Sequence, residues 1–160
     1  MKKIAIASDH AGYRLKETLK ADLVESGYDV LDLGTDGLES VDYPDFGYAM
    51  AEAIRAGRVE RGVLCCGTGI GISIAANRYP EIRAANVHDA LSARFSREHN
   101  DANVICFGER LIGSEVARDS LRVFLDTRFE GGRHIHRVEK LSKPQLPMKT
   151  PMKTKGAAAQ

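Results

Sequence analysis

Short apolar runs alternate with amphipathic segments along most of this chain. The stretch from Tyr13 to Glu25 carries Leu15, Leu19 and Leu23 at helical spacing, so that they share one face. The strands predicted from the apolar runs are Lys3–Ala7, Tyr28–Leu33, Gly62–Cys66, Ile82–Val87 and Asn103–Phe107. The predicted helices are Tyr13–Glu25, Asp42 (as N-cap) to Ala56, the glycine run after Cys66 to Asn77, Asp89–Arg97, Ser114–Thr127 and Gly132–Leu141.

This alternation is typical of a parallel sheet with helices on both faces. We therefore expect an α/β protein with a three-layer, doubly wound open sheet of about five strands, flavodoxin-like or Rossmann-like. The expected strand order is the flavodoxin-like 2-1-3-4-5. The pattern predicts one domain over residues 1–141 and a tail over residues 142–160 that is rich in proline and repeats PMKT, which we expect to be disordered.

Composition excludes several classes of function. The formal net charge is +1, so no overall positive field favours nucleic acid. No run approaches the roughly 18 apolar residues of a membrane span. The N-terminal run is broken at Asp9, unlike a signal peptide. The three cysteines, Cys65, Cys66 and Cys106, form neither a disulfide framework nor a zinc-binding pattern, and free thiols predict a cytoplasmic protein.

Two segments with reactive side chains follow the first and third predicted strands. In an open α/β sheet, ligands bind beyond the carboxyl ends of the strands where the strand order reverses. In the expected order that point lies between these two strands. Ser8-Asp9-His10 and the run from Cys66 to Gly71 are thus predicted to line the two sides of one crevice.

The run Cys-Gly-Thr-Gly-Ile-Gly from Cys66 matches none of the common phosphate or nucleotide loops. It lacks the lysine of a Walker loop, the spacing of a dinucleotide fingerprint and the arginine of a C-x5-R phosphatase. Its backbone amides beside a thiol suit the stabilisation of negative charge. A tight strand-to-helix turn that requires glycine is the equally open structural interpretation.

The adjacent cysteines face opposite sides of their strand. Cys66 borders the glycine run, where amides at a helix start stabilise a thiolate and make it a base or a nucleophile. Cys65 and Cys106 are predicted to be buried, inert thiols.

The other polar candidates have ordinary interpretations as well. Asp9 is a candidate N-cap of the first helix, and His10 a candidate loop residue. Arg133 and Arg137 are four residues apart on one predicted helical face, which suits a phosphate clamp or simple solvation. His134 and His136 do not share a helical face, so no metal pair is expected.

Six segments together resemble the type B ribose-5-phosphate isomerase family, which includes hexose-phosphate relatives. They cover about residues 1–141 in order and read SDHAGYRLK, DYPDF, CGTGIGISIAANR, SREHNDANV, FGERLIG and EGGRHIHRVEKL. The resemblance implies an aldose–ketose isomerase of the pentose phosphate pathway that needs no metal or other cofactor. Some members use a carboxylate in the helix after the glycine loop as the base, but ISIAAN has none.

The resemblance also implies a role for each matching residue. Cys66 matches the base that moves a proton between C2 and C1. Thr68 and the amides of Gly67, Gly69, Ile70 and Gly71 match the hole for the enediolate oxygen. His99 with Asp9 matches the groups that open the sugar ring. The expected substrate ligands are Asn100 for a sugar oxygen and His10, Arg110, Arg133 and Arg137 for the phosphate.

The position of His99 suggests a site shared between subunits. The helix before it should run antiparallel to the strands, which places His99 and Asn100 at the amino edge of the sheet, away from Cys66. We therefore expect a homodimer with shared active sites, or a dimer of dimers. Alternatives for function are an isomerase of allose 6-phosphate or galactose 6-phosphate, a non-catalytic sugar-phosphate sensor and a thiol-dependent phosphatase.

Overall fold

A computed structural model of the protein describes residues 2–143. Its five strands form one sheet in which every neighbouring pair is parallel. The predicted α/β class with an open parallel sheet is therefore confirmed. The strands are β1 (Lys3–Ser8), β2 (Asp29–Asp32), β3 (Gly62–Cys66), β4 (Ala84–Asn86) and β5 (Val104–Gly108).

The observed strand order is β2-β1-β3-β5-β4, so the expected order 2-1-3-4-5 is wrong in its last two places. Every residue of β5 is buried, whereas all three residues of β4 are only half-buried. The longer apolar strand therefore takes the interior position beside β3, and the short strand takes the edge. The reversal between β1 and β3, on which the predicted crevice depends, is unaffected.

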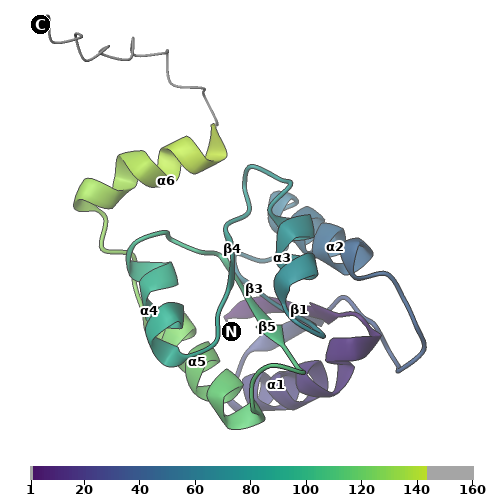
Figure 1. The fold of residues 1–160 in the computed structure, drawn as a ribbon. Helices are drawn as coiled ribbons and strands as arrows, with labels where there is room; N and C mark the ends of the chain where they lie inside the picture. The colour runs from purple at the N-terminus through teal and green to yellow at the C-terminus, as the bar shows by residue number, and fades with distance from the viewer. Residues whose placement is uncertain (1, 144–160) are drawn as a thin grey trace, which may run out of the picture.

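The helices cover both faces of the sheet (Figure 1). Helices α1 (Tyr13–Glu25), α4 (Ala90–Glu98) and α5 (Ser114–Asp126) pack on one face, and α2 (Tyr43–Arg55) and α3 (Ile70–Ala76) on the other. Each face has its own apolar core, because successive strand residues point to opposite sides. In β3, Cys65 belongs to the first core and Cys66 to the second.

Two helix starts correspond to the sequence signals. Asp42 occupies the N-cap position of α2 with Pro44 in the first turn, as predicted, although the Asp42 side chain makes no capping hydrogen bond. Asp89 caps α4, where its carboxylate accepts a hydrogen bond of 2.7 Å from the amide of Ser92. Such a bond satisfies one of the free amides at a helix start.

The predicted C-terminal helical segment over 132–141 is present. Its first turn is the 3-10 turn η2 (Gly132–His134), which continues directly into the helix α6 (Ile135–Ser142). Helix α6 stands clear of the sheet and has no buried residue (Figure 1). Most of the predicted tail, residues 144–160, lies outside the described part of the chain. Within residues 2–143, no helix is long and apolar enough to cross a membrane.

Candidate active site

The ends of β1 and β3 lie side by side at the carboxyl edge of the sheet. Ser8, the last residue of β1, pairs with Cys65, so the residues that follow them, Asp9 and Cys66, lie at the same edge. The amide of Asp9 donates a hydrogen bond of 3.3 Å to the carbonyl of Cys65. The two reactive segments found in the sequence are thus adjacent in the fold.

Asp9 organises the turn that follows β1. Its Oδ1 accepts hydrogen bonds from the amides of Ala11 at 2.9 Å and Gly12 at 3.0 Å, which caps the 3-10 turn η1 (His10–Gly12). Gly12 packs tightly on β3, because a methyl group there would lie 2.5 Å from the carbonyl carbon of Cys65. Asp9 is only 5% exposed. Asp9 therefore caps this turn and not α1 itself, whose N-cap position is Gly12, so the predicted capping role is displaced by one turn. Both bonds go to the same oxygen, so Oδ2 carries neither.

Cys66 points into the glycine loop after β3. Its Sγ accepts a hydrogen bond of 3.0 Å from the amide of Gly69. Gly69 has φ +76°, in the left-handed region that favours glycine, and directly precedes α3. Thr68 Oγ1 accepts from the amide of Ile70 at 3.3 Å. An amide directed at sulfur favours the thiolate over the thiol, because it donates to the charged form.

Cys65 and Cys106 are not in contact with the glycine loop through a hydrogen bond to sulfur, as Cys66 is. Both are fully buried in the apolar cores, and burial raises the pKa of each thiol well above its ordinary value. They remain protonated at neutral pH and have no access to solvent. Their predicted role as inert core residues agrees with this placement, and Cys66 is the thiol at the site.

Three side chains line the glycine loop. A methyl group at Gly67 would lie 3.4 Å from Nη1 of Arg110, so that arginine, a predicted phosphate ligand, lies against the loop. Tyr43 and Asn86 were not predicted. A methyl group at Gly71 would lie 2.6 Å from the ring of Tyr43, and one at Gly69 would lie 2.3 Å from Asn86 Oδ1. Tyr43 belongs to the DYPDF segment of the family resemblance, but no pattern in the sequence predicts that either side chain meets the loop.

A partly buried ion pair supports the end of β1. Lys16 is completely buried, and its Nζ lies 3.0 Å from both carboxylate oxygens of Asp32. Burial alone would raise the pKa of Asp32, but hydrogen bonds from Lys20, the amide of Gly34 and Lys16 outweigh it and lower the pKa. Gly34 in turn accepts a hydrogen bond of 2.7 Å from the amide of Ser8. The network therefore holds the strand that presents Asp9.

His10 is held by the loop before α2. Its Nδ1 lies 3.1 Å from the amide nitrogen and 3.2 Å from the carbonyl oxygen of Val41. This contact with the loop orients the ring. His10 is also the first residue of η1, so its interpretation as a loop residue is incomplete.

His99 belongs to a different group of side chains. It follows α4 directly, and its ring stacks between those of Phe95 and His134, at centroid distances of 4.8 and 4.6 Å. His134 is buried, and its Nε2 lies 3.5 Å from a carboxylate oxygen of Glu130. Burial, together with the neighbouring His99 and Arg133, lowers the pKa of His134, which favours its neutral form.

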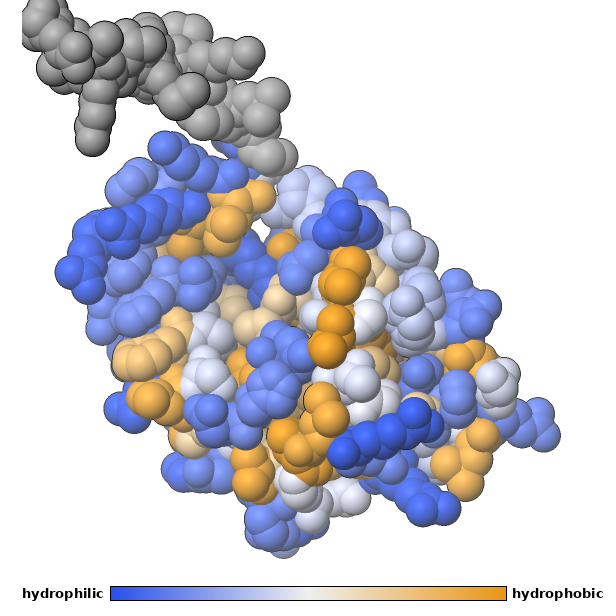
Figure 2. All heavy atoms as spheres, viewed as in Figure 1, coloured by the Kyte–Doolittle hydropathy of each residue, from blue (hydrophilic) through white to orange (hydrophobic). Residues whose placement is uncertain are grey.

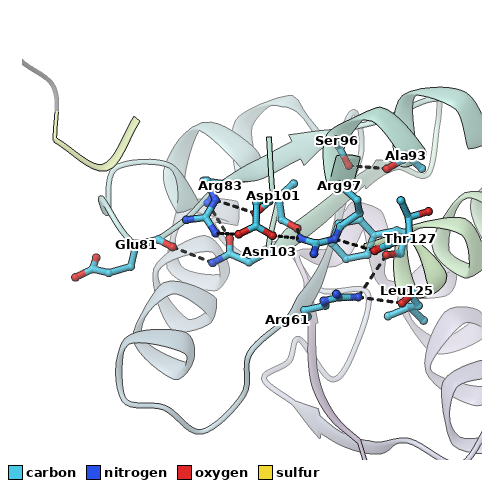
Figure 3. Close-up of polar contacts among 12 residues, drawn as sticks. Arg61, Glu81, Arg83, Ala93, Ser96, Arg97, Asp101, Asn103, Leu125 and Thr127 are labelled. Atoms are coloured by element: carbon cyan, nitrogen blue, oxygen red, sulfur yellow. Dashed lines mark hydrogen bonds and ion pairs between the residues drawn. The ribbon is translucent and has the colours of Figure 1, made fainter. Parts of the chain in front are cut away.

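The connection that follows His99 is short and is held by ion pairs and backbone hydrogen bonds. Asp101 lies 3.0 Å from Nη2 of Arg83 and 2.9 Å from Nη1 of Arg97 (Figure 3). The amide of Asn103 donates to the carbonyl of Arg83, and the amide of Gly62 donates to Asn103. These contacts place residues 98–103 at the amino edge of the sheet, beside the first residues of β3 and β4.

His99 and Cys66 are therefore not brought together within one chain. Cys66 is in register with Gly108, the last residue of β5, whereas His99 precedes the first residue, Val104. Four steps along a parallel strand span about 13 Å. The predicted separation of the two residues at opposite edges agrees with the structure.

The remaining predicted ligands accompany His99. Arg133 lies in η2 and Arg137 in α6, and both are exposed. Nε of Arg133 lies 3.4 Å from Nε2 of His134. Asn100 lines a surface pocket of about 390 Å³ beside β4 and α6. The segment is continuous, but Arg133 lies in its 3-10 turn, so the two arginines are not related by the regular four-residue spacing of one α-helix.

Within residues 2–143, one set of potential metal ligands comes together. Ligand atoms of His99, Glu130 and His134 lie within 4.8 Å of one another. The two imidazole rings are nearly parallel, with 13° between their planes, so their in-plane lone pairs run side by side. A single ion requires lone pairs that converge on it, and this arrangement fits an aromatic stack better.

The sequence profile of the Ribose/Galactose Isomerase family matches residues 4–141. The chain belongs to this family. It is 47% identical over 142 residues to ribose-5-phosphate isomerase B of Escherichia coli (strain K12), covering 89% of this chain and 95% of that protein. It is 44% identical to D-erythrulose-4-phosphate isomerase of Pectobacterium atrosepticum, with 88% and 93% covered.

A solved structure is similar as well. Ribose-5-phosphate isomerase B of Clostridium thermocellum superposes with a TM-score of 0.86 at 53% identity, covering 88% of this chain and 95% of that one. The resemblance to type B ribose-5-phosphate isomerases is therefore confirmed, and the chain is an aldose–ketose isomerase of this family.

Proposed function

We propose that this enzyme interconverts ribose 5-phosphate and ribulose 5-phosphate, with Cys66 as the base. The observation that carries the proposal is the hydrogen bond of 3.0 Å from the Gly69 amide to Cys66 Sγ, at the sheet edge shared with Asp9. Relatives named ribose-5-phosphate isomerase B support the five-carbon substrate. The three buried, unpaired thiols fit the reducing cytoplasm.

The thiolate removes the proton from C2 of the open-chain aldose. The electron pair forms the C1–C2 double bond, and negative charge moves to the oxygen on C1. Transfer of the hydroxyl proton from O2 to O1 and return of the carbon proton from sulfur to C1 give the ketose. Thr68 accepts through Oγ1 from Ile70 and still has its own hydroxyl proton to donate to the enediolate. One such donor is typically worth about 10²–10³ in rate.

The phosphate supplies binding energy far from the reacting carbons. Arg110 and His10 lie at the edge with Cys66, while Arg133 and Arg137 accompany His99. Arginine binds phosphate oxygens with two parallel hydrogen bonds and remains charged at all relevant pH values. A phosphate held between both sets fixes the sugar carbon against the sulfur.

A second copy of the chain completes this site. The residues around His99 and those around Cys66 lie at opposite edges, so one chain contains two half-sites but no whole one. Helix α6 has no buried residue, although Ile135, Val138 and Leu141 are apolar. An isolated helix of eight residues is marginal in water, so α6 requires a partner.

The same surface carries other exposed apolar side chains. Among the described residues, six of the twelve exposed large hydrophobic side chains lie on α3, α4 and α6. Figure 2 shows apolar patches over α3 and α4 on the face turned to the viewer. Strand β4 ends the sheet on this side, and an exposed edge favours a partner. The six side chains are Ile70, Ile74, Leu91, Phe95, Ile135 and Leu141.

Other substrates require a test, because one relative is named for a four-carbon substrate. We expect the protein, treated exhaustively with EDTA, to convert ribose 5-phosphate to ribulose 5-phosphate without releasing phosphate. Backbone amides and Thr68 supply the charge stabilisation, so no metal is required. Erythrulose 4-phosphate, allose 6-phosphate and galactose 6-phosphate, assayed in parallel, rank the substrates by kcat/KM.

Each unexpected result would identify a different function. Binding of ribose 5-phosphate without turnover would indicate a sensor, and phosphate release would indicate a phosphatase. Activity that EDTA removes and a divalent ion restores would contradict charge stabilisation by amides alone.

The histidine group predicts a difference between the two directions of the reaction. Ribose 5-phosphate exists mainly as a closed furanose, whereas ribulose 5-phosphate cannot close a five-membered ring through its phosphorylated C5 oxygen. His99→Asn should therefore reduce kcat for ribose 5-phosphate by about 10²-fold, the contribution of one acid–base group, and affect kcat for ribulose 5-phosphate much less. The control is His136→Asn, an exposed histidine of α6 outside the stack. Equal losses for both substrates would place His99 in the enediolate step.

A further inference from the structure

Asn86 contacts the glycine loop from the edge of the sheet. It is the last residue of β4, and its Nδ2 donates a hydrogen bond of 3.4 Å to the carbonyl oxygen of Thr68. Its Oδ1 is buried and has no hydrogen-bond partner within residues 2–143. The amide nitrogen of Asn86 is thus hydrogen-bonded to the loop, and its Oδ1 lies against Gly69.

The peptide group between Thr68 and Gly69 connects Asn86 to Cys66. In a planar trans peptide the carbonyl and the N–H point in opposite directions. The Thr68 carbonyl points to Asn86, and the Gly69 N–H points to Cys66 Sγ, at 3.0 Å. A bond that fixes the carbonyl therefore also fixes the direction of the amide.

This peptide requires such a restraint. Gly69 has φ +76°, but glycine adopts negative φ about as readily. Rotation of the Thr68–Gly69 peptide would turn the amide away from sulfur at little cost in backbone energy. Gly108 leaves room for the peptide on the other side, because a methyl group there would lie 2.6 Å from the Thr68 oxygen. The donor of Asn86 is the side-chain contact that favours the observed orientation.

We propose that Asn86 is a positioning residue that keeps the Gly69 amide directed at the Cys66 sulfur and so stabilises the thiolate. The proposal rests on the proposed function only in assigning a catalytic consequence to that thiolate. Asn86 itself does not touch the reacting carbons.

The test is the alkylation of Cys66 by iodoacetamide as a function of pH, located by tandem mass spectrometry. Asn86→Leu keeps the size of the side chain and removes the donor. We expect alkylation at a fixed pH near 7 to slow by up to about tenfold and the pH–rate profile to move to higher pH, as for the loss of one charge-assisted hydrogen bond. kcat should fall by a similar factor while KM changes little. If the leucine variant fails to fold, Asn86→Ser removes the same contact.

Asn77 offers a matched control. Its Nδ2 also donates to a backbone carbonyl of β4, that of Ala84, at 2.9 Å, but it does not contact the loop. Asn77→Ala should leave the alkylation profile unchanged. An unchanged profile in the Asn86 variants, or an equal shift in the Asn77 variant, would overturn the proposal. A shifted profile with unchanged kcat would support the positioning role and refute Cys66 as the base.

Discussion

Cys66→Ala should lower kcat/KM by about 10²–10⁴-fold in both directions of the reaction, the contribution of a positioned base. The loss should be the same for aldose and ketose, because both pass through the same enediolate. Cys66→Ser should be nearly as inactive, although it preserves the size of the side chain, because a serine hydroxyl is almost never ionised at neutral pH. Initial rates of ribulose 5-phosphate formation and of its consumption, followed in a coupled assay, give kcat/KM in the two directions.

The control for this prediction is the neighbouring thiol. Cys65 lies on the opposite face of β3, fully buried, and its raised pKa keeps it protonated. Cys65→Ala should retain most of the turnover at moderate temperature. Its thermal stability should fall slightly, because removal of the sulfur leaves a small cavity in the core. Near-normal turnover by the Cys66 variants, or a comparable loss in the Cys65 variant, would contradict the assignment of the base.

The second large effect is recovery of activity when two inactive proteins are mixed. If His99 acts on the crevice of its partner, a dimer of one Cys66→Ala chain and one His99→Asn chain contains one site with both defects and one with neither. Random exchange makes about half of the dimers mixed, so about a quarter of the wild-type sites should return. Activity is measured before and after exchange, and native mass spectrometry measures the fraction of mixed dimers.

The structure provides a negative control for this experiment. Asp9 and Cys66 lie at the same sheet edge of one chain, and the Asp9 amide bonds to the residue before Cys66. In a mixture of Cys66→Ala with Asp9→Asn, every site of a mixed dimer carries one defect, so no activity should return. Recovery in this pair, or none in the His99 pair despite confirmed exchange, would refute the shared site.

The sequence by itself determined the class of fold and the local position of the reactive residues. Helical spacing identified α1 by Leu15, Leu19 and Leu23, all of which are buried. Strand periodicity separated Cys66 from Cys65, since neighbouring residues of a strand face opposite sides. Both features are local, because a few consecutive residues decide them.

Only the tertiary structure decided which distant segments are neighbours. It placed β5 beside β3 because its fully apolar run is better buried in the interior than the short β4. It also brought Asn86 and Tyr43 to the glycine loop and buried Lys16 against Asp32. Such contacts join residues far apart in the chain, and they depend on the lateral order of strands and the packing of helices. A linear pattern specifies the face on which a side chain lies, but the neighbour it meets there is set by the packing of the whole domain.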